Sequence, residues 1–408
     1  MAIPVPLVEI GFDIVGFNAP FFTLDDPTKG LLDNTEFPLG GQIFYDVTDK
    51  VKSIATRRGK NRQLDEFDAG LANVLFDNND RTFDPEYELS PYFGQVIPKR
   101  AIRISSGGNR IFTGVVDDWN LDYSPGGNSE ASAASSDAFT LFNTQTLPAG
   151  TATAQLAGER VNAILDLPDV SWPESERDIE LGQTQLGADV FPEDANVLEY
   201  LRQVARSEPG NVFMAADGKV VFSDRSPNSD GSTLTFADDG TGIPYQGLKV
   251  VYGSELLYNE IVLGSQFAGT FLAQDPTSIA DYGVLNLTQI DLLTADATYL
   301  ETLSAYYAIK YSQPEYRFES LDVVLDEVSP ADQQTILGLE ISDFVTIKFT
   351  PNGIPPAIVK IAEVIRIDHD ITPDAHVVSI GFATVDNGFW TLSDGIFGRL
   401  SAGNVLGF

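Results

Sequence analysis

The residues most suggestive of metal chemistry lie in the stretch DNNDRTFDPEYE, which begins at Asp77. Asp77, Asn79 and Glu88 occupy positions 1, 3 and 12 of a calcium-binding EF-hand loop. Position 5, which should supply an oxygen ligand, is Arg81, and position 6, which needs glycine for a sharp turn, is Thr82. The preceding residues alternate like a strand, whereas an EF-hand requires a helix there. The pattern argues against calcium, and these acids need another explanation.

A second candidate is the run Asp368-His369-Asp370, which is followed by the only other histidine of the chain, His376. In an extended strand Asp368 and Asp370 point to one face and His369 to the other. Because this geometry separates the would-be ligands, we interpret the run as a solvated, acidic strand end and not as a metal site.

Catalytic motifs are missing from the sequence. It contains no Gly-x-Ser-x-Gly elbow and no Walker loop. With 59 acids some carboxylates will lie close by chance, but no pair is singled out as a glycosidase dyad. Trp119, Trp172 and Trp390 are too scattered to predict a sugar platform, and core packing is their default role. We therefore assign no catalytic, cofactor-binding or metal-binding residue, and favour a structural or binding protein over an enzyme.

The composition excludes several classes of partner. The chain has 408 residues, 43% of them apolar, which predicts a folded protein of more than one domain. Its formal charge of -34 repels phosphate backbones and anionic membranes, so stable binding to nucleic acid or membrane is not expected. DNA could still slide past an acidic wall without adhering to it. The absence of cysteine excludes disulfides and thiolate metal sites.

The N-terminal residues alternate like a strand and do not resemble a signal peptide, and no apolar run is long enough to cross a membrane. We therefore expect a soluble protein made in a cytoplasm. Most of the remaining sequence also predicts strands. The expected hairpins join 101–105 to 110–119, 213–215 to 220–222, and 345–349 to 359–367.

Four helices are expected. Apolar stripes predict helices over 157–165, from an N-cap at Asp194 to residue 205, and over 297–311, and a short helix beginning at Ser329-Pro330. The region 146–248 combines two of these helices with a hairpin, and we interpret it as a small α+β domain between two β-rich ones.

A weak internal repeat supports this division. VVDDWNLDYSP (115–125) aligns without gaps with EVIRIDHDITP (363–373), which places Val116 on Val364 and Pro125 on Pro373. Each copy follows a strand–turn–strand unit and precedes another strand, which favours duplication of one β unit. The alternative is that two unrelated hairpins both end in Asp-x-Ser/Thr-Pro, a common turn opener.

Two parts of the chain carry a family resemblance. In the N-terminal part, a strand ending in Asp-Asn is followed by Asn/Asp-x-x-Phe-x-Pro, Ser-Pro-Tyr, a Pro-Lys/Gly-Arg strand entry and Ile-Phe-Thr-Gly with a downstream Trp. These are residues 74–78, 80–85, 90–92, 98–100 and 111–114 with Trp119. The C-terminal part contributes LYNEIVL (257–263), DPTSIADYG (275–283), LEISDFVTI (339–347) and FWTLSDGIFGRL (389–400). Together they resemble the minor tail proteins of long-tailed phages, especially phages of actinobacterial hosts; the middle region matches only loosely.

This resemblance implies a mainly β protein with minor α content, in which two tube-like β-barrel domains flank a small α+β domain. The expected division is 1–148, 149–248, 249–392 with a peripheral insertion near 265–315, and a C-terminal extension 393–408. Similar proteins form a tail-tip hub, akin to contractile-tail baseplate hubs, in which three chains with two barrels each make a pseudo-sixfold ring. In this interpretation, the acids after Asp77 cap backbone amides, and Phe83 returns to the sheet.

The resemblance also implies partners. These are two further copies in a homotrimer, the distal tail protein at the end of the tail tube, other minor tail proteins and the tape measure protein. DNA would only pass through the channel during genome ejection. The location would be the virion tail tip, after synthesis in the host bacterial cytoplasm, with no cofactor and no enzymatic activity. The glycine-rich extension 393–408 is either a docking arm or a disordered tail. A tail-borne glycan hydrolase and a calcium-dependent extracellular β adhesin are the alternative functions.

Overall fold

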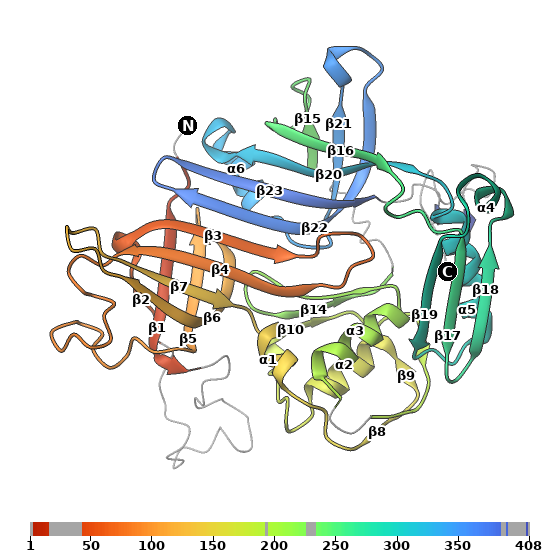
Figure 1. Cartoon of the computed structure of the whole chain (residues 1–408), viewed down its shortest axis with the longest axis horizontal. Coiled ribbons are helices and arrows are strands. Elements are labelled where there is room, and N and C mark those ends of the chain that lie inside the picture. The colour runs from red at the N-terminus through yellow and green to blue at the C-terminus, as the bar shows by residue number, and fades with distance from the viewer. Residues whose placement is uncertain are drawn as a thin grey trace.

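A large antiparallel-rich sheet dominates the computed structural model, which describes residues 3–15, 43–191, 195–225, 234–384, 389–390 and 405–406. The strand order is β16-β20-β23-β22-β3-β4-β7-β6-β5-β1-β2, with β21 on β22 and β15 on β21. Figure 1 shows the strands of both ends of the chain running side by side through its upper part. The N-terminal strands are β1 (Pro6–Val15), β2 (Tyr45–Asp46), β3 (Val51–Gly59), β4 (Asp68–Asp77), β5 (Arg100–Ser106), β6 (Asn109–Asp122) and β7 (Glu130–Ser136). The C-terminal strands are β15 (Leu234–Ala237), β16 (Gly247–Gly253), β20 (Glu315–Val324), β21 (Phe344–Phe349), β22 (Ile358–Thr372) and β23 (Ala375–Thr384).

The prediction of a mainly β chain with few helices is confirmed. Within the described ranges, however, the strands form one continuous open sheet, and neither half closes into a barrel of its own. The physical reason is visible at the centre of the sheet, where β22 of the second half pairs with β3 of the first. Each half therefore uses one edge to extend the common sheet, and that edge is not available for closing a separate barrel.

The same strand arrangement occurs twice. The first repeat has the order β3-β4-β7-β6 and the second has the order β16-β20-β23-β22. In each repeat a shorter strand, β5 or β21, forms a hairpin with the first part of the long strand β6 or β22. The β6–β7 pairing shifts between Val116 and Asp118, and the β22–β23 pairing shifts between Val364 and Arg366.

A backbone detail marks the same correspondence. Lys99 and Ser342 both have positive φ, at 65° and 72°. Their N–H groups donate to the carbonyl oxygens of Val116 and Val364, which the sequence alignment had matched. Because the agreement includes the bulge, the strand order and this turn, the predicted repeat is confirmed, and a shared turn opener alone does not account for it.

The two repeats share one hydrophobic core. Phe76 and Phe112 from the first repeat and Val364 and Ile380 from the second are buried in the same cluster. The interior therefore continues across the β22–β3 junction. Helix α6 (Pro330–Leu337), whose N-cap Ser329 accepts a hydrogen bond from the Asp332 amide, covers one end of this cluster.

A second core lies in the α+β unit drawn in yellow and green below the sheet in Figure 1. Helix α3 begins after Asn196, whose side chain accepts the Glu199 amide, and not after the expected cap Asp194, which lies outside the described residues. The elements of this unit are α1 (Phe139–Thr144), β8 (Thr151–Ala152), β9 (Gln155–Leu156), α2 (Ala157–Leu165), β10 (Arg177–Ile179), β11 (Gln185–Leu186), β12 (Asp189–Val190), α3 (Val197–Ser207), β13 (Asn211–Met214) and β14 (Val220–Ser223).

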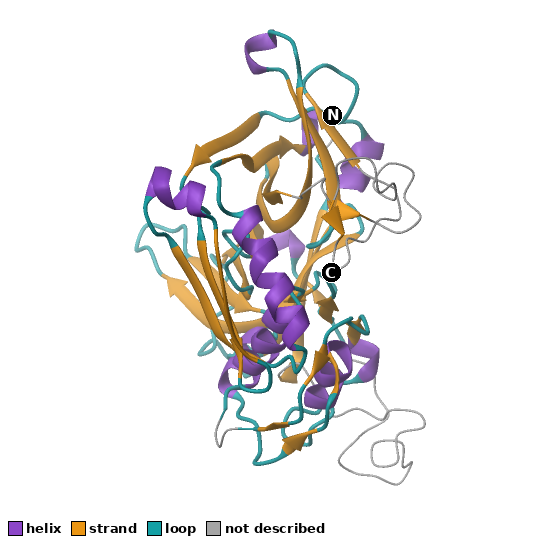
Figure 2. Cartoon of the chain, turned by 90° about the vertical axis from the view of Figure 1, so that its right-hand side faces the viewer, coloured by secondary structure: helices purple, strands orange, loops and turns teal. Residues whose placement is uncertain are grey.

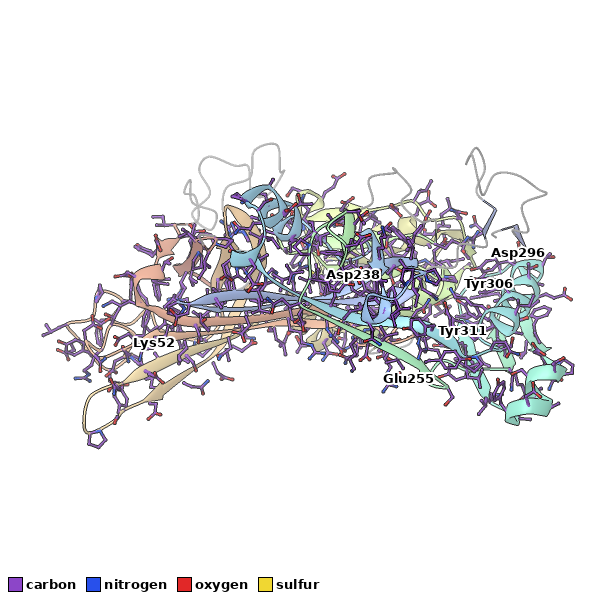
Figure 3. All side chains as sticks on the ribbon, turned by 90° about the horizontal axis from the view of Figure 1, so that it is seen from above. Lys52, Asp238, Glu255, Asp296, Tyr306 and Tyr311 are labelled. Carbon is purple, nitrogen blue, oxygen red and sulfur yellow. The ribbon has the colours of Figure 1, made fainter. Side chains whose placement is uncertain are left out.

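A third unit is inserted between β16 and β20. Its strands are covered on one side by helix α5, as Figure 2 shows. Figure 3 places its Tyr306 and Tyr311 at the opposite end of the molecule from Lys52 of β3. The elements are β17 (Glu260–Ser265), β18 (Gly269–Gln274), α4 (Pro276–Tyr282), β19 (Asn286–Leu292) and α5 (Ala297–Lys310). The remaining short elements are η1 (Thr48–Lys50), η2 (Glu174–Glu176), η3 (Leu325–Glu327), η4 (Pro351–Gly353), β24 (Phe389–Trp390) and β25 (Val405–Leu406).

Candidate functional site

The most extensive candidate surface is the face of the two repeats that points away from the core, which we call the exposed sheet face. Period-two alternation creates it: on β3, Ile54, Thr56 and Arg58 are buried, whereas Ala55 and Arg57 are exposed. Cross-strand pairs carry this face across both repeats. One row runs Asp118–Ala134–Asn73–Ala55–Asp370–Val377, and the next runs Leu71–Arg57–Asp368–Ser379–Asp322.

Small and acidic side chains predominate on the exposed sheet face. Of the eleven positions in the two rows, four are alanine, serine or asparagine and four are aspartate. The acids of this face include Asp77, Asp118, Asp122, Glu130, Glu319, Asp322, Asp368 and Asp370, and its bases include Lys52, Arg57, Lys249, Arg317 and Arg366. An excess of carboxylates on a broad, smooth face repels polyanions such as DNA.

Local contacts fix several of these acids. The Lys52 ammonium lies 2.9 Å from a carboxylate oxygen of Glu130, and Arg366 Nε lies 3.1 Å from Asp368 Oδ2. Ser379 donates a hydrogen bond of 2.5 Å to Asp322. Burial raises the pKa of Asp368, although Arg366 and Arg57 oppose this effect.

The junction between the repeats is tightly built. β22 and β3 pair antiparallel from Arg366 opposite Gly59 to Ile371 opposite Ile54. Gly59 has φ of 115°, and a Cβ there would lie 2.2 Å from the carbonyl oxygen of Ile365, the bulged residue of β22. That carbonyl accepts the N–H of Lys60, the residue that follows β3, at 2.9 Å. Only glycine fits this close approach of two backbones.

Arg58 connects the junction to other parts of the chain. Its side chain is 4% exposed, and its Nη1 lies 2.6 Å from Glu340 Oε1, in the segment before β21. The same guanidinium donates to the carbonyl oxygens of Ile111 in β6 and Met214 in β13. Glu340 also accepts the N–H of Ala216 at 2.8 Å. One buried ion pair therefore joins both repeats and the α+β unit.

A buried carboxyl lies where the first repeat leads into helix α1. Asp137 accepts the backbone N–H of Gly70 at 2.6 Å and that of Phe139 at 3.0 Å. Burial raises the pKa of Asp137 to about 7, against the lowering effect of those two hydrogen bonds. Its contacts are with the backbone of the chain itself, which gives it a structural role.

The two histidines lie together on the core side of the second repeat. His369 Nδ1 is 3.0 Å from His376 Nε2, and Ser106 Oγ is 3.3 Å from His376 Nδ1. As predicted, Asp368 and Asp370 lie on the other face of β22. Burial lowers the pKa of His376 to about 4 and that of His369 well below its usual value, with a further contribution from the neighbouring ring. Both imidazoles are therefore neutral at pH 7.

The acids of the stretch after Asp77 are held by nearby backbone amides, as expected. Asp77 accepts the Asn79 amide, Asp80 that of Thr82 and Asp84 that of Glu86. The side-chain oxygen of Asn78 accepts the Phe83 amide at 2.9 Å. Phe83 is fully buried against Phe76, so the turn does return it to the sheet. Across the part of the chain that the structure describes, no group of three or more His, Cys, Asp or Glu side chains is arranged to hold a metal ion.

The two tryptophans whose side chains the structure describes lie in different cores and form no common platform. Trp119 stacks on Phe83 with ring centroids 5.7 Å apart, and its Nε1 donates to the carbonyl oxygen of Ile97. Trp172 is buried in the core of the α+β unit. The side chain of Trp390 lies outside the described residues.

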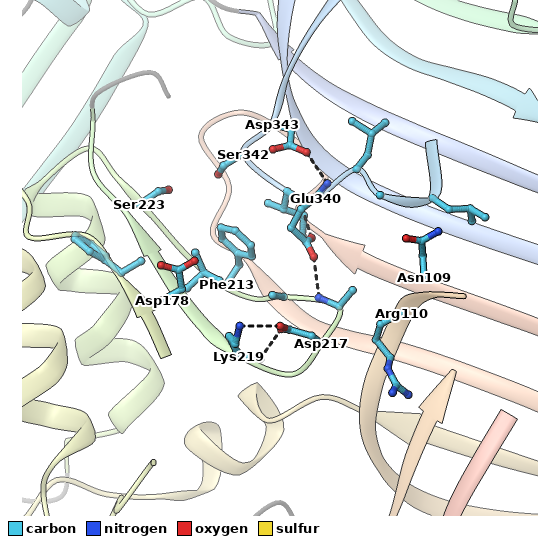
Figure 4. A pocket seen from close by; sticks show the side chains of 18 of the residues that line it. Asn109, Arg110, Asp178, Phe213, Asp217, Lys219, Ser223, Glu340, Ser342 and Asp343 are labelled. Atoms are coloured by element: carbon cyan, nitrogen blue, oxygen red, sulfur yellow. Dashed lines mark hydrogen bonds and ion pairs between the residues drawn. The ribbon is translucent and has the colours of Figure 1, made fainter. Parts of the chain in front are cut away.

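A cleft of about 440 Å³ lies between the β13–β14 hairpin and the end of the sheet (Figure 4). Asp178 and Glu180 also line the cleft, and most of its carboxylates are engaged by the protein itself. Asp217 pairs with Lys219, Asp343 accepts the Glu340 amide, and Glu340 is held by the contacts described above. These acids keep the loops in place and do not converge as the free pair that a glycosidase requires.

Sequence reasoning missed the ion pair of Arg58 with Glu340 and the buried carboxyl of Asp137. The signal available was weak: Arg58 occupies a position of β3 that alternation assigns to the interior. Within the described residues, no helix combines the length and the apolar character needed to cross a membrane.

Comparisons with known proteins place this architecture. No protein-family model matches the chain, and no curated protein matches it. Among solved structures, the chain is similar to a 43 kDa tail protein of prophage MuSo2 from Shewanella oneidensis, with a TM-score of 0.56 and 12% identity over 93% of this chain and 97% of that one. It is also similar to a tail protein from Neisseria meningitidis MC58, with a TM-score of 0.60 and 10% identity over 93% and 97% of the two chains. At such low identity the likeness establishes the fold and not the function. Over most of its length, this chain has the fold of phage tail proteins.

Proposed function

We propose that the protein is a structural component of a phage tail tip, where three copies form a pseudo-sixfold ring that continues the channel of the tail tube. The observation that carries this proposal is the repeated four-strand order within one continuous sheet. Two equivalent units per chain allow a threefold assembly to meet a sixfold tube. The fold shared with two tail proteins supports the same conclusion.

In this role the exposed sheet face lines the channel. Its small side chains leave a smooth surface, and its excess of carboxylates keeps DNA and ejected proteins from adhering as they pass. The α+β unit and the insertion lie away from this face and hold neighbouring tip proteins. These neighbours are the distal tail protein, other minor tail proteins and the tape measure protein, so that the hub supports host attachment and genome ejection.

The proposal keeps the division into barrel-like domains over 1–148 and 249–392, a middle domain over 149–248 and an extension over 393–408, although α1 packs in the core of the middle domain and β15 joins the large sheet. Each repeat, open within one chain, would become part of a closed barrel only in the ring. The extension lies almost entirely outside the described residues, and we propose it as a docking arm. The protein would act mechanically, in the virion, without catalysis or cofactor.

Electron microscopy of the purified chain tests the proposal directly. We expect ring-shaped particles with three copies, six similar units around a central bore and a diameter matching the tail tube. A chain that remains monomeric at micromolar concentration, both alone and mixed with the distal tail protein, would contradict it. A compact oligomer without a bore would contradict it as well.

A further inference from the structure

When the two repeats are joined through β22 and β3, each keeps one outer edge, and within the described residues neither outer edge has a strand partner. β16 pairs only with β20, and β6 from Asp118 onward pairs only with β7, because its pairing with β5 ends at Val115. Exposed edges of this kind are templates for another strand, and proteins normally cover or block them. Within the chain, the equivalent edges are already joined, since β22 pairs with β3.

The pairing partners define which residues correspond between β3 and β16. Ala55 pairs with Asn73, which pairs with Ala134, whereas Lys249 pairs with Ser320, which pairs with Gly381. Ala134 and Gly381 are equivalent, because they pair with Asp118 and Arg366, the residues after the two bulges. Lys249 is therefore the counterpart of Ala55.

The other end of β16 gives the same alignment. Gly59 pairs with Asp68, and Gly253 pairs with Glu315. Counting along β4 and β20 from Asn73 and Ser320 makes Asp68 and Glu315 equivalent, so Gly253 is the counterpart of Gly59. Both ends of the strand thus agree without a gap, although the local bulges of β3 and β16 differ in position.

We propose that β6 of one copy pairs antiparallel with β16 of the next copy, in the register that β22 and β3 use within the chain. The proposal rests on the ring described above and identifies its subunit contact. The expected partners are Asp118 with Gly253, Trp119 with Tyr252, Asn120 with Val251, Leu121 with Val250, Asp122 with Lys249, and Tyr123 with Leu248.

The side chains brought together in this register are complementary. Asp122 faces Lys249, an exposed base that already pairs with Glu319 at 2.7 Å and would then lie between two carboxylates, and Leu121 faces Val250. Tyr252, whose side chain is 67% exposed in the single chain, meets Trp119. In a register shifted by one residue, the acidic side chains of β6 would point to the opposite face of the sheet from Lys249.

A second contact follows from the same equivalence. Lys99 and Ser342 are equivalent residues of the two repeats, so Ile97, two residues before Lys99, corresponds to Glu340, two residues before Ser342. In the alignment of β3 with β16, Tyr252 corresponds to Arg58. Glu340 and Arg58 form the buried ion pair of the internal junction. Their counterparts, Ile97 and Tyr252, are both large and exposed, at 40% and 67%. The contact between copies therefore replaces an ion pair with apolar burial, and a second copy of this chain is the occupant that fits both edges.

The absence of cysteine allows a clean test by disulfide trapping. We would introduce Asp122→Cys in one preparation and Lys249→Cys in another, because both positions are exposed and neither belongs to a core. Mixing the two and oxidising them should give covalent heterodimers, and the double variant should give covalent trimers. The matched control combines Asp118→Cys with Lys249→Cys; its cysteines are four residues out of register, about 13 Å apart along the strand, and it should cross-link at least tenfold less.

The outcomes separate this contact from the ring itself. Light scattering of the unoxidised variants reports whether an oligomer forms, and the disulfides report which edges meet. An oligomer without the Asp122–Lys249 cross-link would overturn the proposed pairing while leaving the ring intact. Equal cross-linking in the control pair would overturn the register. A monomer in every preparation, without cross-links, would overturn both the contact and the ring.

Discussion

Replacing Glu340 by alanine should destabilise the chain far more than removing a typical acidic side chain. The change leaves the guanidinium of Arg58, only 4% exposed, without its carboxylate partner, and leaves the Ala216 amide without its acceptor. Breaking a buried ion pair in this way costs about 3–5 kcal/mol. Because the Glu340 side chain is itself 29% exposed, water can partly replace it, and we expect a loss at the lower end, about 3 kcal/mol.

A matched control is Glu315→Ala. Glu315 is paired with Lys360 at 3.2 Å, but the two side chains are 41% and 26% exposed. Loss of such a surface pair costs about 0–1 kcal/mol. Urea unfolding followed by tryptophan fluorescence and by circular dichroism would measure both variants, with coincidence of the two probes checked before free energies are compared.

A double-mutant cycle then isolates the ion pair. Arg58→Met combined with Glu340→Ala removes the charge that Glu340→Ala leaves uncompensated, so the double variant should be more stable than the sum of the single losses by about 1–3 kcal/mol. If Glu340→Ala unfolds at the same urea concentration as Glu315→Ala, or if the two single losses add, Arg58 does not tie the junction electrostatically and the reasoning fails.

Three further predictions can be checked together. Tyr252→Lys should leave the melting temperature of the single chain nearly unchanged and reduce its oligomerisation at least tenfold by light scattering; a ring as stable as that of the unmodified chain would contradict the proposed contact. Gly59→Ala should cost about 1–3 kcal/mol more than Gly108→Ala, because both residues have positive φ but only Gly59 approaches another backbone; equal melting temperatures would refute this. The depressed pKa values of His369 and His376 mean that, below the unfolded-state pKa of about 6.5, the unfolded chain binds protons that the folded chain does not. The free energy of unfolding should therefore fall by up to about 1.4 kcal/mol per histidine and pH unit between pH 6.5 and 5, relative to a double glutamine variant; identical pH profiles would exclude the pair as the cause.

The elements that were predicted correctly from the sequence are those that depend on the residues of one short segment. Alternation and turn residues located the β5–β6, β13–β14 and β21–β22 hairpins. Apolar stripes located α2, α3 and α5 within a few residues and the Ser329-Pro330 start located α6, whereas the short helices α1 and α4 were not predicted. The alignment of Val116 with Val364 found the repeat because the bulge and the following strand keep the same spacing in both copies. The cap of α3 was misplaced because Asn196 and Asp194 are both good caps, and only the fold distinguishes them.

The elements that sequence could not predict depend on contacts between distant segments. Nothing in the residues around Gly59 indicates that β3 pairs with β22, more than 300 residues later, and this pairing is the reason the two barrels expected from the resemblance are open within the chain. Arg58 is a similar case. Its burial is stabilised by Glu340, 282 residues away, and a sequence pattern cannot report such a partner.

The internal and the proposed external junction differ in a way that their physical circumstances explain. Within the chain, β3 and β22 are always held near each other, so the junction can include a buried ion pair whose desolvation offsets much of its attraction. Between copies, association must also overcome the loss of translational freedom, and apolar burial is the more effective stabilisation. The exchange of Arg58 and Glu340 for Tyr252 and Ile97 at equivalent positions follows this requirement. The facing pair Asp122 and Lys249 then supplies what apolar contact lacks, a preference for one register, because a shifted strand would move Asp122 away from Lys249, which would keep only its partner within the chain, Glu319.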